Sequence, residues 1–186
     1  MDTFSWEDEL FAKISHQIDR FGWSVVYVGG GGCSVPGCAG DHESDLVGVG
    51  LPPYGYTVGL PLHFDHAELV LVGLDRDATL RILNLIGSAI ANGARLAPGD
   101  PLDVDGMSLK VGRCAVSRVR NGLVAVSMDY HDAIKHPSVP NPLQIIWSDA
   151  DGRSPGDPRF DRQAQPLLAR PAARDRAASR QRPRTC

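Results

Sequence analysis

The stretch from Gly55 to Leu74, GYTVGLPLHFDHAELVLVGL, constrains the fold of this chain more than any other. It holds two short apolar runs, at 56–60 and 68–74, on either side of a polar turn. Short runs rich in β-branched residues are typical of strands. Because the second run is almost wholly apolar, it predicts a central strand that is covered on both faces. We therefore expect this strand pair to organise the core, with Val58, Leu69, Leu71 and Leu74 buried in it.

Two amphipathic helices are predicted around this strand pair. Apolar residues recur at three- and four-residue steps between Trp6 and Phe21, after a capping-box-like start at Ser5. A second helix is expected over 76–91, with an aspartate at its N-cap and Asn92-Gly93 as its stop. Its apolar stripe comprises Leu80, Ile82, Leu83, Ile86, Ala89 and Ile90.

Further strands complete the expected sheet. They are predicted at 23–28, 103–109, 110–119 and 143–147, with Asp105-Gly106 as a hairpin turn. Residues 123–128 fit a strand or a helix, and residues 130–141 resemble a loop. The predicted fold class is α+β, with a mixed or mainly antiparallel sheet of about five to six strands and two main helices packed on it.

The 186 residues predict a single domain over 1–168, interrupted by a long Gly-rich loop at 29–54. The segment 169–186 is expected to be a disordered tail, because it carries six Arg and one Asp and no core-forming pattern. The tail has a charge of +5, which leaves −8 for the rest of a chain whose net charge is −3. An acidic body argues against nucleic acid as a partner, except weakly through the tail.

The apolar runs are too short for a membrane span, which needs about 18 residues. We therefore expect no membrane contact and a cytoplasmic location. The four cysteines are then expected as thiols. The sequence gives no reason to expect a cofactor.

The polar turn carries the main candidate site, formed by His63, Asp65 and His66. Imidazole and carboxylate groups in one turn suit a bound ligand, a metal ion or a general base. The alternative, which we favour, is that His66 hydrogen-bonds the backbone and holds the turn. Gln144 is a further candidate, because Gln144 and Trp147 point to opposite faces of one strand. We expect Trp147 in the core and Gln144 facing a pocket or a partner.

A weaker metal pattern lies in the Gly-rich loop, where Cys33, Cys38 and His42 have the spacing Cys-x4-Cys-x3-His. Zinc sites usually draw four ligands from paired short spacings, and no second pair completes this one. Free thiols in a loop are the favoured interpretation. Cys114, in a predicted strand, is interpreted as a small buried residue rather than a nucleophile.

The order of several motifs resembles a known family. The motifs are YTVGL at 56–60, Phe64-x-His66-x-Glu68-Leu69, Leu83-Asn84, Leu143-Gln144, Trp147-x-Asp149 with Gly152 and Pro155, and QPLL at 165–168. Between Phe21 and Leu168 the chain resembles bacterial and phage proteins of domain-of-unknown-function family 4262. It departs from them in a longer segment at 28–54 and in an aromatic stretch reduced to Tyr130 and His131. The resemblance implies an α+β domain and no assigned activity, cofactor or catalytic residue.

Two classes of function fit these features. The favoured one is a non-enzymatic module in which the loop 61–67 and the rim of the sheet bind a small molecule or a protein. The alternative is a small hydrolytic or metal-assisted enzyme, with His66 as base or ligand and Asp65 or Glu68 orienting it. No complete catalytic set is visible in the sequence, which favours the binding module.

Overall fold

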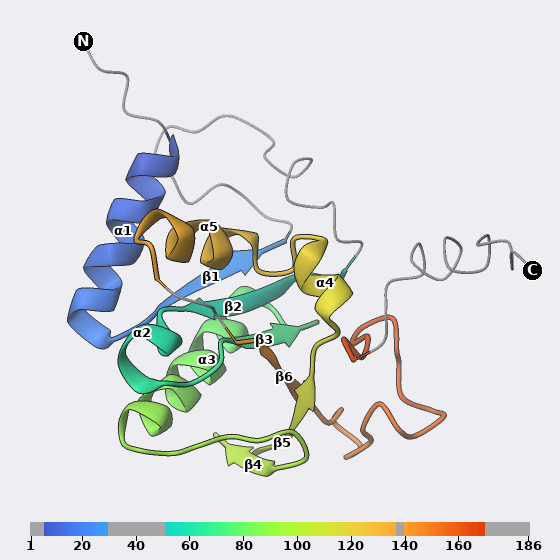
Figure 1. Cartoon of the computed structure of the whole chain (residues 1–186). Coiled ribbons are helices and arrows are strands. Elements are labelled where there is room, and N and C mark those ends of the chain that lie inside the picture. The colour runs from blue at the N-terminus through green and yellow to red at the C-terminus, as the bar shows by residue number, and fades with distance from the viewer. Residues whose placement is uncertain (1–5, 30–50, 137–139, 170–186) are drawn as a thin grey trace, which may run out of the picture.

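A computed structural model of the chain describes residues 6–29, 51–136 and 140–169. These residues form a six-stranded sheet with helices on both faces (Figure 1). Almost all of the Gly-rich segment at 29–54, including Cys33, Cys38 and His42, lies outside the described residues. The Arg-rich tail lies outside them from residue 170.

The sheet has the strand order β1-β2-β3-β6-β5-β4. Only the β3–β6 pairing is parallel among the described strands, so the sheet is mixed and mainly antiparallel, as predicted. The strands are β1 (Ser24–Val28), β2 (Tyr54–Val58), β3 (Leu69–Val72), β4 (Pro101–Val104), β5 (Met107–Arg113) and β6 (Leu143–Trp147).

The sheet divides the hydrophobic core in two, and helices cover both of its faces. On one face, α1 (Trp6–Phe21) and α5 (Ala125–Ala133) pack over β2 and the side chains of Val70 and Val72. On the other face, α3 (Arg76–Ala91) packs over Leu69 and Leu71 (Figure 1). The bounds of α3 match the predicted helix, and Asp75 caps it by accepting a hydrogen bond from the Ala78 backbone N–H at 2.8 Å.

The strand β3 lies at the centre, as its apolar sequence predicts. All four of its residues are buried, because successive side chains enter the two cores alternately. Val58, Leu69 and Leu71 are fully buried, whereas Leu74 lies beyond the strand and is only partly buried. None of the described helices is both long and apolar enough to cross a membrane.

The chain after β5 differs from the prediction. Residues 116–119, expected to continue a strand, instead begin the short helix α4 (Val116–Arg120). The strand stops at Arg113, which is paired with Leu143 at the start of β6, because the preceding Pro142 has no backbone N–H to extend the pairing. Residues 125–133 form α5, so much of the expected loop at 130–141 is helical.

A short helix also replaces part of the expected turn after β2. The strand β2 begins two residues earlier than predicted, and α2 (Leu60–Phe64) follows it directly. Gly59 starts this helix with φ of 112°, a left-handed conformation that favours glycine, and Pro61 lies in the first turn. The two residues end the strand and redirect the chain toward β3.

Candidate functional site

The predicted turn site places two of its three residues at the surface. His63 lies in α2 and is exposed. Asp65 is also exposed and caps α2 in a left-handed conformation with φ of 49°. Among the residues that the structure describes, neither side chain has a hydrogen-bond partner that would hold it toward His66. Ligand contact by His63 and Asp65 stays a prediction.

His66 is buried, and both of its ring nitrogens bind backbone groups. Its Nδ1 donates to the carbonyl of Ala67 at 2.7 Å, and its Nε2 accepts from the backbone N–H of Leu96 at 3.2 Å. This geometry leaves no ring nitrogen for a substrate proton or a metal ion. His66 instead ties the turn to the segment that follows α3.

Gln144 is completely buried and binds a C-terminal segment rather than facing a pocket. Its Nε2 donates to the carbonyl of Pro166 at 2.9 Å, and its Oε1 accepts from the Leu168 backbone N–H at 2.7 Å. We call residues 160–168 the C-terminal strap. Trp147 is partly buried on the opposite face, where its Nε1 donates to the carbonyl of Val72 at 2.8 Å. The structure therefore does not bring Gln144 together with His63, Asp65 and His66.

A buried polar cluster that the sequence analysis missed lies under α5. Glu68 has no exposed surface, and its carboxylate accepts from the Thr57 hydroxyl at 2.5 Å and the Gly59 backbone N–H at 2.6 Å. Ser127 and His131, one turn apart on α5, lie 3.5 and 3.3 Å from Glu68 Oε1. Three of these contacts reach Oε1 and one reaches Oε2, so both oxygens of the carboxylate have hydrogen-bond donors within the core.

The sequence carried one signal for this cluster. Glu68 is the only charged residue of an otherwise apolar strand run, and a carboxylate in such a position needs buried donors. The local sequence does not reveal its partners on α5, because residues 123–128 fit a strand or a helix and residues 130–141 resemble a loop. Once α5 is recognised as a helix, the four-residue spacing of Ser127 and His131 places both on one face.

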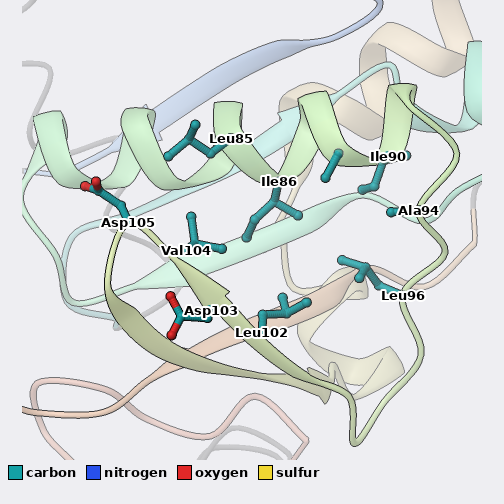
Figure 2. A pocket seen from close by; sticks show the side chains of 10 residues that line it. Leu85, Ile86, Ile90, Ala94, Leu96, Leu102, Asp103, Val104 and Asp105 are labelled. Carbon is teal, nitrogen blue, oxygen red and sulfur yellow. The ribbon is translucent and has the colours of Figure 1, made fainter.

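A groove lies between α3 and the edge strand β4, and Figure 2 shows the side chains that line it. It is an open hollow with a volume of about 310 Å³, and side chains from the helix point toward those of the strand. Its lining is mainly apolar and includes Leu85, Ile86, Ile90, Leu96, Leu102 and Val104. Leu96 belongs to the segment that His66 holds, so the predicted turn site and the groove share a wall.

The carboxylates at the groove's rim are few. Asp103 and Asp105 belong to the lining, and Asp105 forms an ion pair with Arg81 of α3 at 3.1 Å. Both partners of this pair are well exposed, so it fixes the turn between β4 and β5 only loosely. The groove therefore presents an apolar floor, and the charge of one of its two carboxylates, Asp105, is balanced by Arg81.

Cys114 does not behave as a nucleophile. It is buried beside Arg118, and burial raises the pKa of its thiol to about 12, despite the opposing effect of the Arg118 charge. A thiol with such a pKa is almost wholly protonated at neutral pH, and only the thiolate is nucleophilic. Within residues 6–29, 51–136 and 140–169, no group of three or more His, Cys, Asp or Glu residues is arranged to hold a metal ion.

The architecture defines a class: an α+β domain with a mainly antiparallel sheet, helices on both faces and an apolar groove at one edge. The chain belongs to the family described as domain of unknown function DUF4262, whose sequence model matches residues 17–161. Neither the curated proteins nor the solved structures include a significant match to this chain.

Proposed function

We propose that this protein is a non-enzymatic binding module, which takes a small apolar molecule, or the apolar end of a larger one, in the groove between α3 and β4. The observation that carries the proposal is the exposure of Leu85 inside an apolar hollow. Leu85 leaves 45% of its surface accessible, beside buried Ile86 and Ile90. Covering that surface with an apolar ligand is favourable, at about 25 cal/mol per Å² of apolar area removed from water.

The walls of the groove are held in place by contacts outside it. One wall is α3, a sixteen-residue helix packed on the sheet. Another is the segment around Leu96, whose backbone N–H binds His66. The floor strand β4 pairs through four residues with β5, from Pro101 opposite Lys110 to Val104 opposite Met107. A cavity with such fixed walls loses little entropy when a ligand enters it.

The size of the groove favours a small ligand. Its volume of about 310 Å³ lies at the lower end of the range of roughly 300–1,000 Å³ that is typical of small-molecule sites. A folded protein partner would need a far larger contact, of about 800 Å² on each side. A small molecule is therefore the occupant that we propose.

The chemistry of the lining favours binding over catalysis. Among the described residues that line the groove, the only ionisable side chains are Asp103 and Asp105, and Asp105 is paired with Arg81. General acid–base catalysis requires a positioned group that can exchange a proton with the substrate. His66, the base of the enzyme hypothesis, uses both nitrogens for backbone contacts.

The same proposal places the protein in the cytoplasm, where buried Cys114 stays a thiol.

The test is a fluorescence titration with Nile red, a neutral apolar dye, on the full chain. Leu85→Glu places a charge in the groove without removing a buried side chain. Ser88→Glu makes the same charge change on an exposed position of α3 outside the groove. We expect the dye's dissociation constant to rise at least about tenfold in Leu85→Glu, a loss of about 1.4 kcal/mol, and to be unchanged in Ser88→Glu.

Circular dichroism and thermal melting would show that both variants keep the fold. Equal dye affinity in the wild type and in Leu85→Glu would overturn the proposal. A loss of affinity in both variants would also overturn it, because that result reports general repulsion rather than a groove.

A further inference from the structure

Two histidines meet at the C-terminal end of α5, and the local backbone explains why. Lys135 adopts a left-handed conformation with φ of 55° just after the helix. The backbone N–H of His136 then donates to the carbonyl of His131 at 2.9 Å, and that of Lys135 donates to the carbonyl of Asp132 at 3.0 Å. This pair of bonds is the Schellman motif, which brings the side chains of its first and last residues together. In most helices those residues are apolar, and here both are histidines.

The two imidazole rings lie in contact, with centroids 5.2 Å apart. His131 leaves only 1% of its surface accessible. The Nδ1 atoms of His131 and His136 are both buried, and neither has a hydrogen-bond partner among the described residues. Leaving a buried polar atom unpaired costs about 1–3 kcal/mol, so two such atoms on rings in contact call for a partner.

Glu68 fixes which nitrogen of His131 carries the proton. A carboxylate only accepts hydrogen bonds, so the Nε2 of His131 donates to it, and the lone pair of the neutral ring lies on Nδ1. A carboxylate that orients a histidine through one nitrogen, while the other nitrogen holds a metal ion, is a recurrent arrangement in metal sites. The hydrogen bond from His131 to Glu68 thus leaves the lone pair of His131 Nδ1 available to bind a metal ion.

We propose that His131 and His136 bind one zinc-class divalent cation through their Nδ1 atoms, with Glu68 as the residue that positions His131. Imidazole nitrogens suit Zn²⁺, Cu²⁺ and Ni²⁺. Zn–N bonds of about 2.0–2.1 Å at a tetrahedral angle hold two ring centroids roughly 5 Å apart, which matches the observed separation. The separation of the two rings is therefore the one that a shared ion requires.

Two protein ligands leave the other coordination positions to water. Structural zinc sites use four protein ligands, and catalytic ones use three. The affinity of the two histidines for Zn²⁺ is accordingly lower than that of sites with three or four protein ligands. The bound ion therefore exchanges with the solvent. Water molecules on the ion are positions where an anionic ligand can bind.

The test is a zinc titration of the full chain, with Zn²⁺ alone as the probe and a chromophoric chelator as the competitor. The first variant is His136→Ala, because His136 is half-buried and lies outside α5, whereas His131→Ala removes a core side chain. The matched control is His63→Ala, which removes an exposed histidine. A parent chain carrying Cys33→Ser, Cys38→Ser and His42→Ala separates this site from the cysteines of the Gly-rich segment.

We expect one Zn²⁺ per chain in the wild type, in the parent chain without those cysteines and in His63→Ala. Binding should be lost in His136→Ala and weakened about 10–100-fold in Glu68→Gln. Zinc should raise the melting temperature of the wild type but not of His136→Ala. In nuclear magnetic resonance, zinc should shift the Nδ1 signals of both histidines.

Three results would overturn the proposal. The first is the absence of zinc binding in the wild type, which would leave water as the partner of both nitrogens. The second is zinc binding that His136→Ala does not weaken. The third is zinc binding that disappears in the parent chain lacking Cys33, Cys38 and His42. None of these results bears on the apolar groove, whose dye titration contains no metal.

Discussion

The side-chain amide of Gln165 binds both backbone groups of Trp147. Its Oε1 accepts from the N–H of Trp147, and its Nε2 donates to the carbonyl of the same residue, both at 3.1 Å. The side chain thus takes the place of a neighbouring strand at this point of β6. Gln144 makes the reciprocal contact, because its own amide binds backbone groups of the C-terminal strap.

These two sets of hydrogen bonds, made by Gln165 and Gln144, predict that the C-terminal strap is part of the folded domain. Gln165→Ala should lower the free energy of unfolding by about 1–3 kcal/mol, since it leaves two backbone groups of Trp147 unpaired. Gln163→Ala, at an exposed position of the same strap, should change it by less than about 0.5 kcal/mol. Urea denaturation measures both values. Similar stabilities for the two variants would argue against this role of the hydrogen bonds.

Gly73 gives a second test of the same contact. It adopts φ of 88°, and a Cβ at this position would lie 1.9 Å from the carbonyl oxygen of Ala164 in the strap. Gly73→Ala therefore forces the strap away from the sheet, besides the cost of the left-handed conformation. We expect a drop in melting temperature larger than that of Gly152→Ala, where φ is 72° but no atom lies within 4 Å. Equal drops would mean that backbone conformation alone sets the cost.

The buried carboxylate predicts a large loss of stability when it is removed. Glu68→Ala should cost about 3–5 kcal/mol, because it leaves His131, Thr57 and the Gly59 backbone N–H without their acceptor. Ser127→Ala removes only a long contact of 3.5 Å and should cost about 1 kcal/mol or less. Chemical denaturation of both variants compares the two costs. A Glu68→Ala protein as stable as Ser127→Ala would contradict this account of the cluster.

The two histidines of the turn should respond differently to truncation. His66→Ala removes a donor and an acceptor from buried backbone groups and should cost about 1–3 kcal/mol. Because the Leu96 wall then moves, Nile red should also bind more weakly. His63→Ala, at an exposed position, should leave the stability within about 0.5 kcal/mol. Melting curves and dye titrations separate the two effects, and a loss of stability in His63→Ala would count against this division of roles.

Cys114 should resist alkylation in the folded protein. With its pKa raised from 9.0 to about 12, the fraction of thiolate near neutral pH is about a thousandfold smaller than for an ordinary cysteine. A chain in which Cys33, Cys38 and Cys186 are replaced by Ser isolates this thiol. Its reaction with iodoacetamide should be very slow until urea unfolds the protein. Rapid modification under native conditions would contradict the burial of Cys114.

Tyr54 predicts a loss of stability in alkaline solution. Burial raises the pKa of its hydroxyl from 10.0 to about 12, so the folded protein holds a proton that the unfolded chain releases. The stabilising contribution is complete below pH 10 and is lost as the pH rises from about 10 to 12. Urea midpoints across this range should fall less steeply in Tyr54→Phe than in the wild type. Parallel slopes would show that other groups govern the alkaline transition.

The regular elements were the predictable part of this fold. The α3 helix carries its aspartate cap, a complete apolar stripe and an Asn-Gly stop, and all of these act within one segment. Likewise, the hairpin between β4 and β5 follows from Asp105-Gly106, both with positive φ. Where the capping residues, the apolar pattern and the turn residues of a segment all favour one element, the sequence predicts that element correctly.

The misassigned segments depend on contacts that the local sequence does not encode. Val116 and Val119 have strand-forming side chains, yet the pairing of β5 with β6 ends at Arg113, and the chain folds into α4 instead. In the same way, the sequence predicts that Gln144 faces a pocket or a partner because Trp147, on the opposite face of the strand, is expected in the core. The true partners of Gln144 lie more than twenty residues away in the strap. Long-range partners of this kind decide register and burial.

The position of β6 has a consequence for how the chain is made. This strand enters between β3 and β5, although it is the last of the described strands to be synthesised. Until Leu143–Trp147 leaves the ribosome, β3 and β5 each present an unpaired edge that borders the apolar core. Such edges pair readily with other chains. Nascent chains that stop short of Trp147 should therefore depend on chaperones, and the final insertion of β6 should be the step that commits the protein to its native state.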